Sequence, residues 1–162
     1  MPDYWAKFLG GAGTIRRYVS LAPLWLGTGG FSGLSGTLGS LTMLFGADPG
    51  DDAAALSIPE MLGGSAFIDT LNSGGGPYLP GIEYTNISTE HDELVIPYTS
   101  GQLPGGPGTD VTNIVVQDGC PEDWSDHLSI AASKRGAAMV LNALETSEHT
   151  DVPCEFVAPI VG

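Results

Sequence analysis

Three segments of the chain are rich in β-branched and aromatic residues, which favour strands. They are residues 14–22, 82–88 and 110–117. Pro23 follows the first segment directly and is expected to end it, because proline has no N–H to donate to a neighbouring strand. The pattern therefore predicts three separate strands.

Apolar residues at helical spacing occupy the other regular parts of the chain. Residues 3–9 form a short helical segment that ends at Gly10, and residues 65–72 form another that Ser65 is expected to cap. The strongest pattern covers about residues 133–145, where four apolar residues share one face: Ala137, Val140, Leu141 and Leu144. Strands that alternate with helices predict an α/β fold with a mostly parallel sheet flanked by helices.

Length and composition suit one globular domain or a large piece of one. The chain has 162 residues, of which 42% are hydrophobic, so it is not a disordered protein. Its 24 glycines and 12 prolines favour many turns and long loops, above all over residues 23–55.

Charge excludes several kinds of partner. The chain carries 19 acidic and 5 basic residues, which gives a net charge of −14. Nucleic acid and anionic membrane surfaces would be repelled, and the simplest consequence of the charge is solubility. No run of 18 apolar residues is present to span a membrane, and the first five residues lack the basic and apolar regions of a signal peptide.

Two side chains with catalytic chemistry follow predicted strands. Asp92 lies beyond the second strand and His127 beyond the third. In parallel sheets, sites form beyond the carboxyl ends of the strands, so we expect these two residues to lie close together. An imidazole oriented by a carboxylate can activate a serine, and in α/β-hydrolases the chain order is serine, acid, histidine. The serine motif Gly-x-Ser-x-Gly is missing: residues 30–34 and 33–37 fail at its fifth position.

Other assignments of these residues remain open on spacing alone. His91 and His149 are competing imidazoles, and three further acids lie nearby: Glu90, Glu93 and Asp126. A metal site could be assembled from His91, Asp92 and His127, but residues 48–52 do not fit a calcium loop and no nucleotide-binding fingerprint occurs, so we expect no metal or cofactor. Cys120 and Cys154 are either one disulfide in an exported protein or two free thiols.

Several stretches together carry a family likeness. They are residues 4–12, 17–23, 27–28, 64–67, 71–75, 84–93, 97–101, 111–114, 117–118, 120–121 and 126–128. In these stretches the chain resembles the secreted triacylglycerol lipases and esterases of the α/β-hydrolase superfamily, of the type common in actinobacteria. The resemblance implies hydrolysis of lipids or short acyl esters. It also implies a secreted protein with a disulfide between Cys120 and Cys154.

By this resemblance, residues 1–162 are the C-terminal portion of one α/β-hydrolase domain, without the N-terminal strands and the nucleophile elbow. Asp92 would orient His127, which would act as general base and then as general acid. The serine and the oxyanion-hole amides would precede Met1, so the chain alone is expected to have little or no esterase activity. A start assigned too late, a gene fragment and a pseudoenzyme are the three explanations.

The resemblance also places residues 24–80 over the mouth of the active site, as a lid or acyl-pocket insertion. Five apolar residues are candidates for substrate contact: Leu26, Phe31, Leu41, Leu44 and Phe45. Ordinary loop packing is the alternative. Two non-enzymatic hypotheses remain: self-association through an exposed strand edge at residues 14–22, and an acidic secreted protein without a site.

Overall fold

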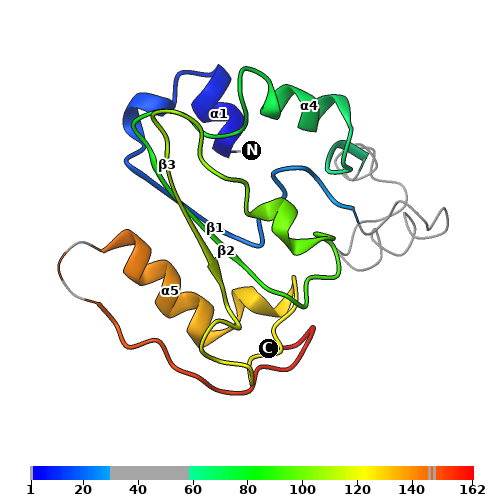
Figure 1. Ribbon diagram of the computed structural model, residues 1–162, viewed down its shortest axis with the longest axis vertical. Coiled ribbons are helices and arrows are strands. Elements are labelled where there is room, and N and C mark those ends of the chain that lie inside the picture. The colour runs from blue at the N-terminus through cyan, green and yellow to red at the C-terminus, as the bar shows by residue number, and fades with distance from the viewer. Residues whose placement is uncertain (1, 30–58, 146, 148) are drawn as a thin grey trace.

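A three-stranded parallel sheet with flanking helices forms the centre of the protein (Figure 1). The computed structural model describes residues 2–29, 59–145, 147 and 149–162. The elements in chain order are α1 (Pro2–Phe8), η1 (Ala12–Thr14), β1 (Arg17–Leu21), α4 (Ala66–Asn72), β2 (Glu83–Ser88), η2 (Tyr98–Gly101), β3 (Asp110–Val115), η3 (Ser129–Ala131) and α5 (Lys134–Leu144). The predicted α/β class with a parallel sheet is confirmed.

A capping serine precedes each of the helices α4 and α5. The Ser65 hydroxyl accepts a hydrogen bond from the N–H of Ile68, and the Ser133 hydroxyl accepts one from the N–H of Gly136. These bonds satisfy N–H groups that have no partner within the helix. Gly10 follows α1 with a φ of 81°, a conformation that a residue without a Cβ adopts at little cost.

The strands lie in the order β1-β2-β3, and all three run parallel. β1 is shorter than the predicted strand over residues 14–22, because Thr14 ends the 3-10 turn η1. Both its N–H and its hydroxyl donate to the carbonyl of Gly11. Such local bonds compete with a strand ladder. β3 ends at Val115, two residues before the predicted end.

Each face of the sheet has its own apolar cluster, and Figure 1 shows α5 on one side of the sheet and α1 with α4 on the other. On the α5 side, Ile87, Val116, Ile130 and Met139 form a buried core. The opposite face is aromatic, and its buried members are Trp25, Tyr78, Ile82 and Tyr84. Covering both faces is what a parallel sheet requires, because neither face can be left to water.

Asn86, in the centre of β2, joins the aromatic face to both neighbouring strands. It is fully buried. Its Oδ1 accepts from the Ser20 hydroxyl (3.0 Å) and from Trp25 Nε1 (2.9 Å). Its Nδ2 donates to the Tyr78 hydroxyl (2.7 Å) and to Asn113 Oδ1 (2.8 Å). All the hydrogen-bonding capacity of the amide is used, so this buried polar group is fully compensated.

β1 and β3 are the two edge strands of the sheet, and each pairs with β2 only among the residues that the structure describes. A groove of about 650 Å³ runs along the unpaired side of β1. Trp5 and Leu144 line this groove and are exposed.

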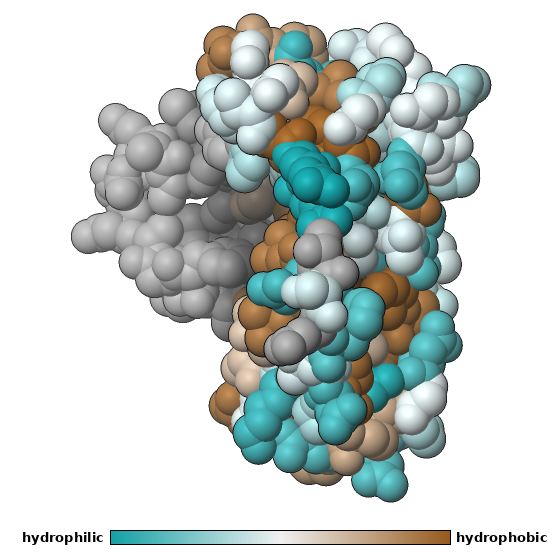
Figure 2. Space-filling view, turned by 90° about the vertical axis from the view of Figure 1, so that its left-hand side faces the viewer, coloured by the Kyte–Doolittle hydropathy of each residue, from teal (hydrophilic) through white to brown (hydrophobic). Residues whose placement is uncertain are grey.

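The face in Figure 2 carries several separate hydrophobic patches among hydrophilic ones. None of the described helices is long and apolar enough to cross a membrane.

Candidate functional site: a carboxylate–imidazole pair

Asp92 and His127 lie within hydrogen-bond distance of each other. Nδ1 of His127 is 3.0 Å from Asp92 Oδ2 and 3.1 Å from Asp92 Oδ1. The Asp92 side chain is 1% exposed and that of His127 is 17% exposed. Asp92 follows the carboxyl end of β2 and His127 that of β3. The predicted proximity is confirmed, whereas the catalytic role of the two residues stays a prediction.

The carboxylate of Asp92 is held by the main chain of its own loop. Oδ1 accepts from the N–H of Leu94 (2.9 Å) and from the N–H of Val95 (2.7 Å). Both of these residues are buried. A carboxylate fixed by two N–H groups has little freedom to turn away from the imidazole. The loop therefore presents Asp92 to His127 in one orientation.

A polar bridge joins the loop after β2 to the loop after β3. Gln117 Nε2 donates to the Thr89 hydroxyl and to the carbonyl of Asp123, both at 3.0 Å. The Gln117 Oε1 accepts from the N–H of Glu90, also at 3.0 Å. The Thr89 hydroxyl in turn donates to the carbonyl of Ser125. These contacts fix the two loops relative to each other close to the acid and the base.

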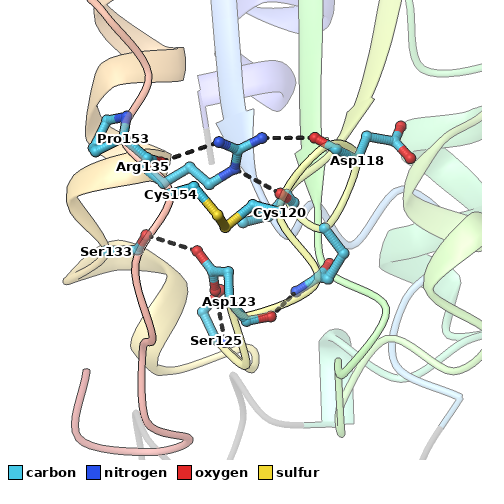
Figure 3. Close-up of a disulfide and its surroundings, with 10 residues drawn as sticks. Asp118, Cys120, Asp123, Ser125, Ser133, Arg135, Pro153 and Cys154 are labelled. Atoms are coloured by element: carbon cyan, nitrogen blue, oxygen red, sulfur yellow. Dashed lines mark hydrogen bonds between the residues drawn. A yellow bond between two sulfur atoms is a disulfide. The ribbon is translucent and has the colours of Figure 1, made fainter.

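The loop that carries His127 is also anchored at its start, as Figure 3 shows. The structure contains the disulfide Cys120–Cys154, which confirms the pairing that the resemblance implied. Next to it, the buried guanidinium of Arg135 donates to three main-chain carbonyls, those of Val116 (2.7 Å), Asp118 (2.6 Å) and Pro153 (3.0 Å). The disulfide links this loop to the C-terminal segment, and the Arg135 hydrogen bonds link it to α5 and to the same segment.

The competing acid Asp126 has a structural role. Its Oδ1 accepts from the N–H (2.9 Å) and the hydroxyl (2.8 Å) of Ser129, and its Oδ2 accepts from the N–H of Ile160 (2.8 Å). Burial raises the pKa of Asp126, but these bonds outweigh burial and hold that pKa below its ordinary value. Asp126 thus shapes the turn after His127 and adds negative charge near the ring.

The electrostatic surroundings favour the protonated form of His127. Burial of the ring lowers its pKa, but the hydrogen bond to Asp92 and the charges of Asp92, Glu93 and Asp126 outweigh burial. The pKa of His127 is therefore raised above its ordinary value. An imidazolium formed at this position is stabilised, which is what a general base requires after it has taken a proton.

The other candidate residues do not join the pair. The ring of His91 stacks on that of Trp124 at a centroid distance of 4.8 Å, and His149 is exposed. Across the described ranges, no three His, Cys, Asp or Glu side chains are grouped as a metal site would need. Glu90 is exposed, and within the described part of the chain it makes a hydrogen bond through its main-chain N–H only.

Of the five residues predicted to contact substrate, the structure describes only Leu26. Phe31, Leu41, Leu44 and Phe45 lie outside the described residues. Leu26 is 45% exposed and lines a pocket of about 490 Å³ together with Tyr78 and Leu103. Neither Asp92 nor His127 lines that pocket, so the structure does not bring Leu26 together with the pair.

Sequence reasoning missed the residues that support the pair. It gave Glu93 only as a competing acid and gave Gln117 no role in a site. The available signal was the position of Gln117, a polar residue two positions beyond the end of a strand of the parallel sheet.

A scan of the chain against models of known protein families and a search among curated proteins find no match.

Proposed function

We propose that Asp92 and His127 are the acid and the base of a Ser-Asp-His triad that hydrolyses carboxylic esters of lipids or of short acyl chains. The observation that carries the proposal is the 3.0 Å contact between a buried carboxylate and Nδ1 of a partly exposed imidazole. The family resemblance adds the substrate class and the order of the residues along the chain. A secreted location belongs to the same proposal, and the disulfide is consistent with it.

The chemistry follows from the orientation of the ring. When Nδ1 donates its proton to Asp92, Nε2 carries a lone pair and has no partner among the described residues. Nε2 can then accept the proton of a serine hydroxyl while the serine oxygen attacks the ester carbonyl. Asp92 stabilises the imidazolium that results, and His127 later returns the proton to the leaving alcohol. A water molecule releases the acyl group by the same two proton transfers.

The nucleophile of this triad is assigned to polypeptide outside residues 1–162. The sequence contains no Gly-x-Ser-x-Gly, and the two near misses at residues 30–34 and 33–37 lie outside the described residues. A histidine and a carboxylate without a serine and an oxyanion hole form no acyl-enzyme. Residues 1–162 alone are therefore expected to hydrolyse nitrophenyl esters no faster than a His127→Ala variant of the same chain.

The test uses the reading frame extended upstream until it includes a strand followed by Gly-x-Ser-x-Gly. That polypeptide is expected to hydrolyse nitrophenyl esters, and His127→Ala is expected to lower kcat/KM at least about 1,000-fold, as loss of a triad member does. His91→Ala is the matched control, because it removes an imidazole that stacks on Trp124 and makes no hydrogen bond to Asp92 among the described residues. Equal activity of the two variants, or an extended frame that carries no such motif, contradicts the proposal.

A second candidate function rests on the open edge of β1. We propose that a second copy of this chain pairs along this edge, because unpaired main-chain groups next to exposed apolar side chains favour strand addition. Sedimentation should then show a concentration-dependent dimer. Leu144→Lys, at the groove, is expected to abolish the dimer, and Phe156→Lys, exposed outside the groove, is expected to leave it intact. A monomer at all concentrations contradicts this function.

A further inference from the structure

His127 is held at two points by two consecutive residues. Asp92 binds its ring, and the Glu93 Oε2 accepts a hydrogen bond from its main-chain N–H at 2.9 Å. Both carboxylates belong to the loop after β2, whereas His127 belongs to the loop after β3. Glu93 is exposed to solvent, so its bond to His127 lies on the surface beside the Asp92–His127 pair.

We propose that Glu93 is a positioning residue for the Asp92–His127 pair, which fixes the main chain of His127 and keeps a second negative charge beside its ring. The inference rests on the proposed function and extends it to a residue that does not touch the reacting atoms. Within this dipeptide, Asp92 orients the imidazole ring of His127, and Glu93 fixes the main chain of His127.

The hydrogen bond explains the positioning. A charged acceptor forms a shorter and stronger bond to an N–H than a carbonyl does. With the main chain fixed by Glu93 and the ring by Asp92, His127 cannot shift along its loop without breaking a contact to the loop after β2. A displacement of about 1 Å is enough to impair a catalytic group, so a hydrogen bond that prevents this displacement should support catalysis.

The charge explains a second effect. Three carboxylates act on the ring of His127, those of Asp92, Glu93 and Asp126. Asp92 is bound by Leu94 and Val95, and Asp126 is bound by Ser129 and Ile160. Glu93 alone of the three is exposed, so its contribution should be the one that dissolved salt screens most strongly.

Two substitutions separate the bond from the charge. Glu93→Gln keeps an oxygen that can accept from the N–H of His127 and removes the charge. Glu93→Ala removes both. Glu90→Gln is the matched control, since it removes the same charge from an exposed glutamate three residues away that makes no side-chain hydrogen bond in the described structure.

The measurement is an NMR titration of the His127 ring in residues 1–162, with the exposed His149 as internal reference. Glu93→Gln is expected to lower the pKa of His127 by about half a unit at low salt and by much less in 1 M salt. Glu90→Gln is expected to change it by less than half as much. Equal shifts in the two variants, or no shift in Glu93→Gln, would overturn the inference.

The bond itself is tested by hydrogen exchange of the His127 amide. Glu93→Ala is expected to speed this exchange about tenfold, as loss of one charge-assisted hydrogen bond of a loop amide would. Glu93→Gln keeps a neutral and therefore weaker acceptor, so its exchange rate is expected to lie between those of the parent and of Glu93→Ala. Unchanged exchange in Glu93→Ala refutes the anchoring role. If Glu93→Ala does not fold, the isosteric Glu93→Gln still decides the inference through the titration.

Failure of the inference and failure of the proposed function give different results. The titration and the exchange measurement need only residues 1–162, so they stand whatever the esterase assay shows. In the extended polypeptide, Glu93→Gln should move the acidic limb of the kcat/KM profile to lower pH by the same half unit. An active enzyme whose profile does not move refutes the role of Glu93 and leaves the triad intact.

Discussion

The hydroxyl of Thr89 donates a hydrogen bond to the main-chain carbonyl of Ser125, and this contact joins the loop of the acid to the loop of the base. The same hydroxyl accepts from Gln117 and from the N–H of His91. Thr89 is fully buried and so is Ser125, whereas Gln117 and His91 are half-buried. The two loops that hold Asp92 and His127 are thus connected through one side chain.

Thr89→Val keeps the shape of this side chain and removes its hydroxyl. Because three buried or half-buried groups then lose a partner, we expect the free energy of unfolding to fall by about 2–3 kcal/mol. Thr99→Val, at an exposed position without a side-chain hydrogen bond within the described ranges, is the control and should change stability by less than about 0.5 kcal/mol. Urea titration measures both, and equal effects of the two variants would show that the bridge contributes nothing.

His127 should make stability depend on pH. Its pKa in the folded protein is raised above that of the unfolded chain, so the folded state holds the proton more tightly. This stabilisation is complete below about pH 6.5, the unfolded value, and is lost as pH rises through the folded pKa. His127→Ala should flatten this part of the stability profile. A profile that His127→Ala leaves unchanged contradicts the raised pKa.

Asp3 should also make stability fall as pH rises, but over a more acidic range than His127. It is 3% exposed and neither carboxylate oxygen has a hydrogen-bond partner among the described residues. Burial, partly offset by the charge of Lys7, raises its pKa to about 6. Between about pH 4 and pH 6 the folded state keeps a proton that the unfolded chain has released, so stability should fall by about 3 kcal/mol over this range.

Asp3→Asn removes this titration and should stabilise the protein at pH 7 by a similar amount. The exposed Asp69→Asn is the control, since it removes the same charge from the surface of α4. Thermal unfolding at pH 4 and at pH 7 distinguishes the two. An Asp3→Asn variant that is no more stable than the parent at pH 7 would contradict the expected cost of burying this carboxylate without a partner.

The disulfide should contribute measurably to stability. Cys120 and Cys154 are 34 residues apart in the chain, and closing a loop of that length stabilises a folded protein by about 4 kcal/mol in the chain-entropy model. The double variant Cys120→Ala with Cys154→Ala is expected to lose stability by this order. Adding a reductant should lower the Tm of the parent and leave that of the double variant unchanged. A parent that is insensitive to the reductant would contradict the expectation.

The part of the site that sequence could predict is the part fixed by chain order and periodicity. Asp92 and His127 follow strands, and parallel strands bring their carboxyl ends to one edge, so the pair was predictable from local patterns. The cap Ser65 was predictable for the same reason, because a cap lies next to the helix it begins. Ser133, which the pattern placed within the last helix, is the cap of α5 instead.

The contacts that hold the pair were not predictable in this way. Arg135 binds carbonyls 17 to 19 residues away, and Glu93 reaches a main-chain N–H 34 residues away. Nothing in the hydrophobic pattern distinguishes a glutamate with such a partner from a solvated one such as Glu90. Asn86 is the clearest case, since a buried asparagine within a strand contradicts local propensity and is explained only by four partners from other segments.

The assignment of His127 as a base oriented by Asp92 is tested most directly by the tautomer of the neutral His127 ring, measured by ¹⁵N NMR of residues 1–162 above its pKa. Nδ1 is expected to carry the proton and donate it to Asp92, which leaves Nε2 unprotonated and able to take a proton from a serine. Asp92→Asn should lose this preference. A neutral ring protonated at Nε2 in the parent chain would contradict the assignment of His127 as the base.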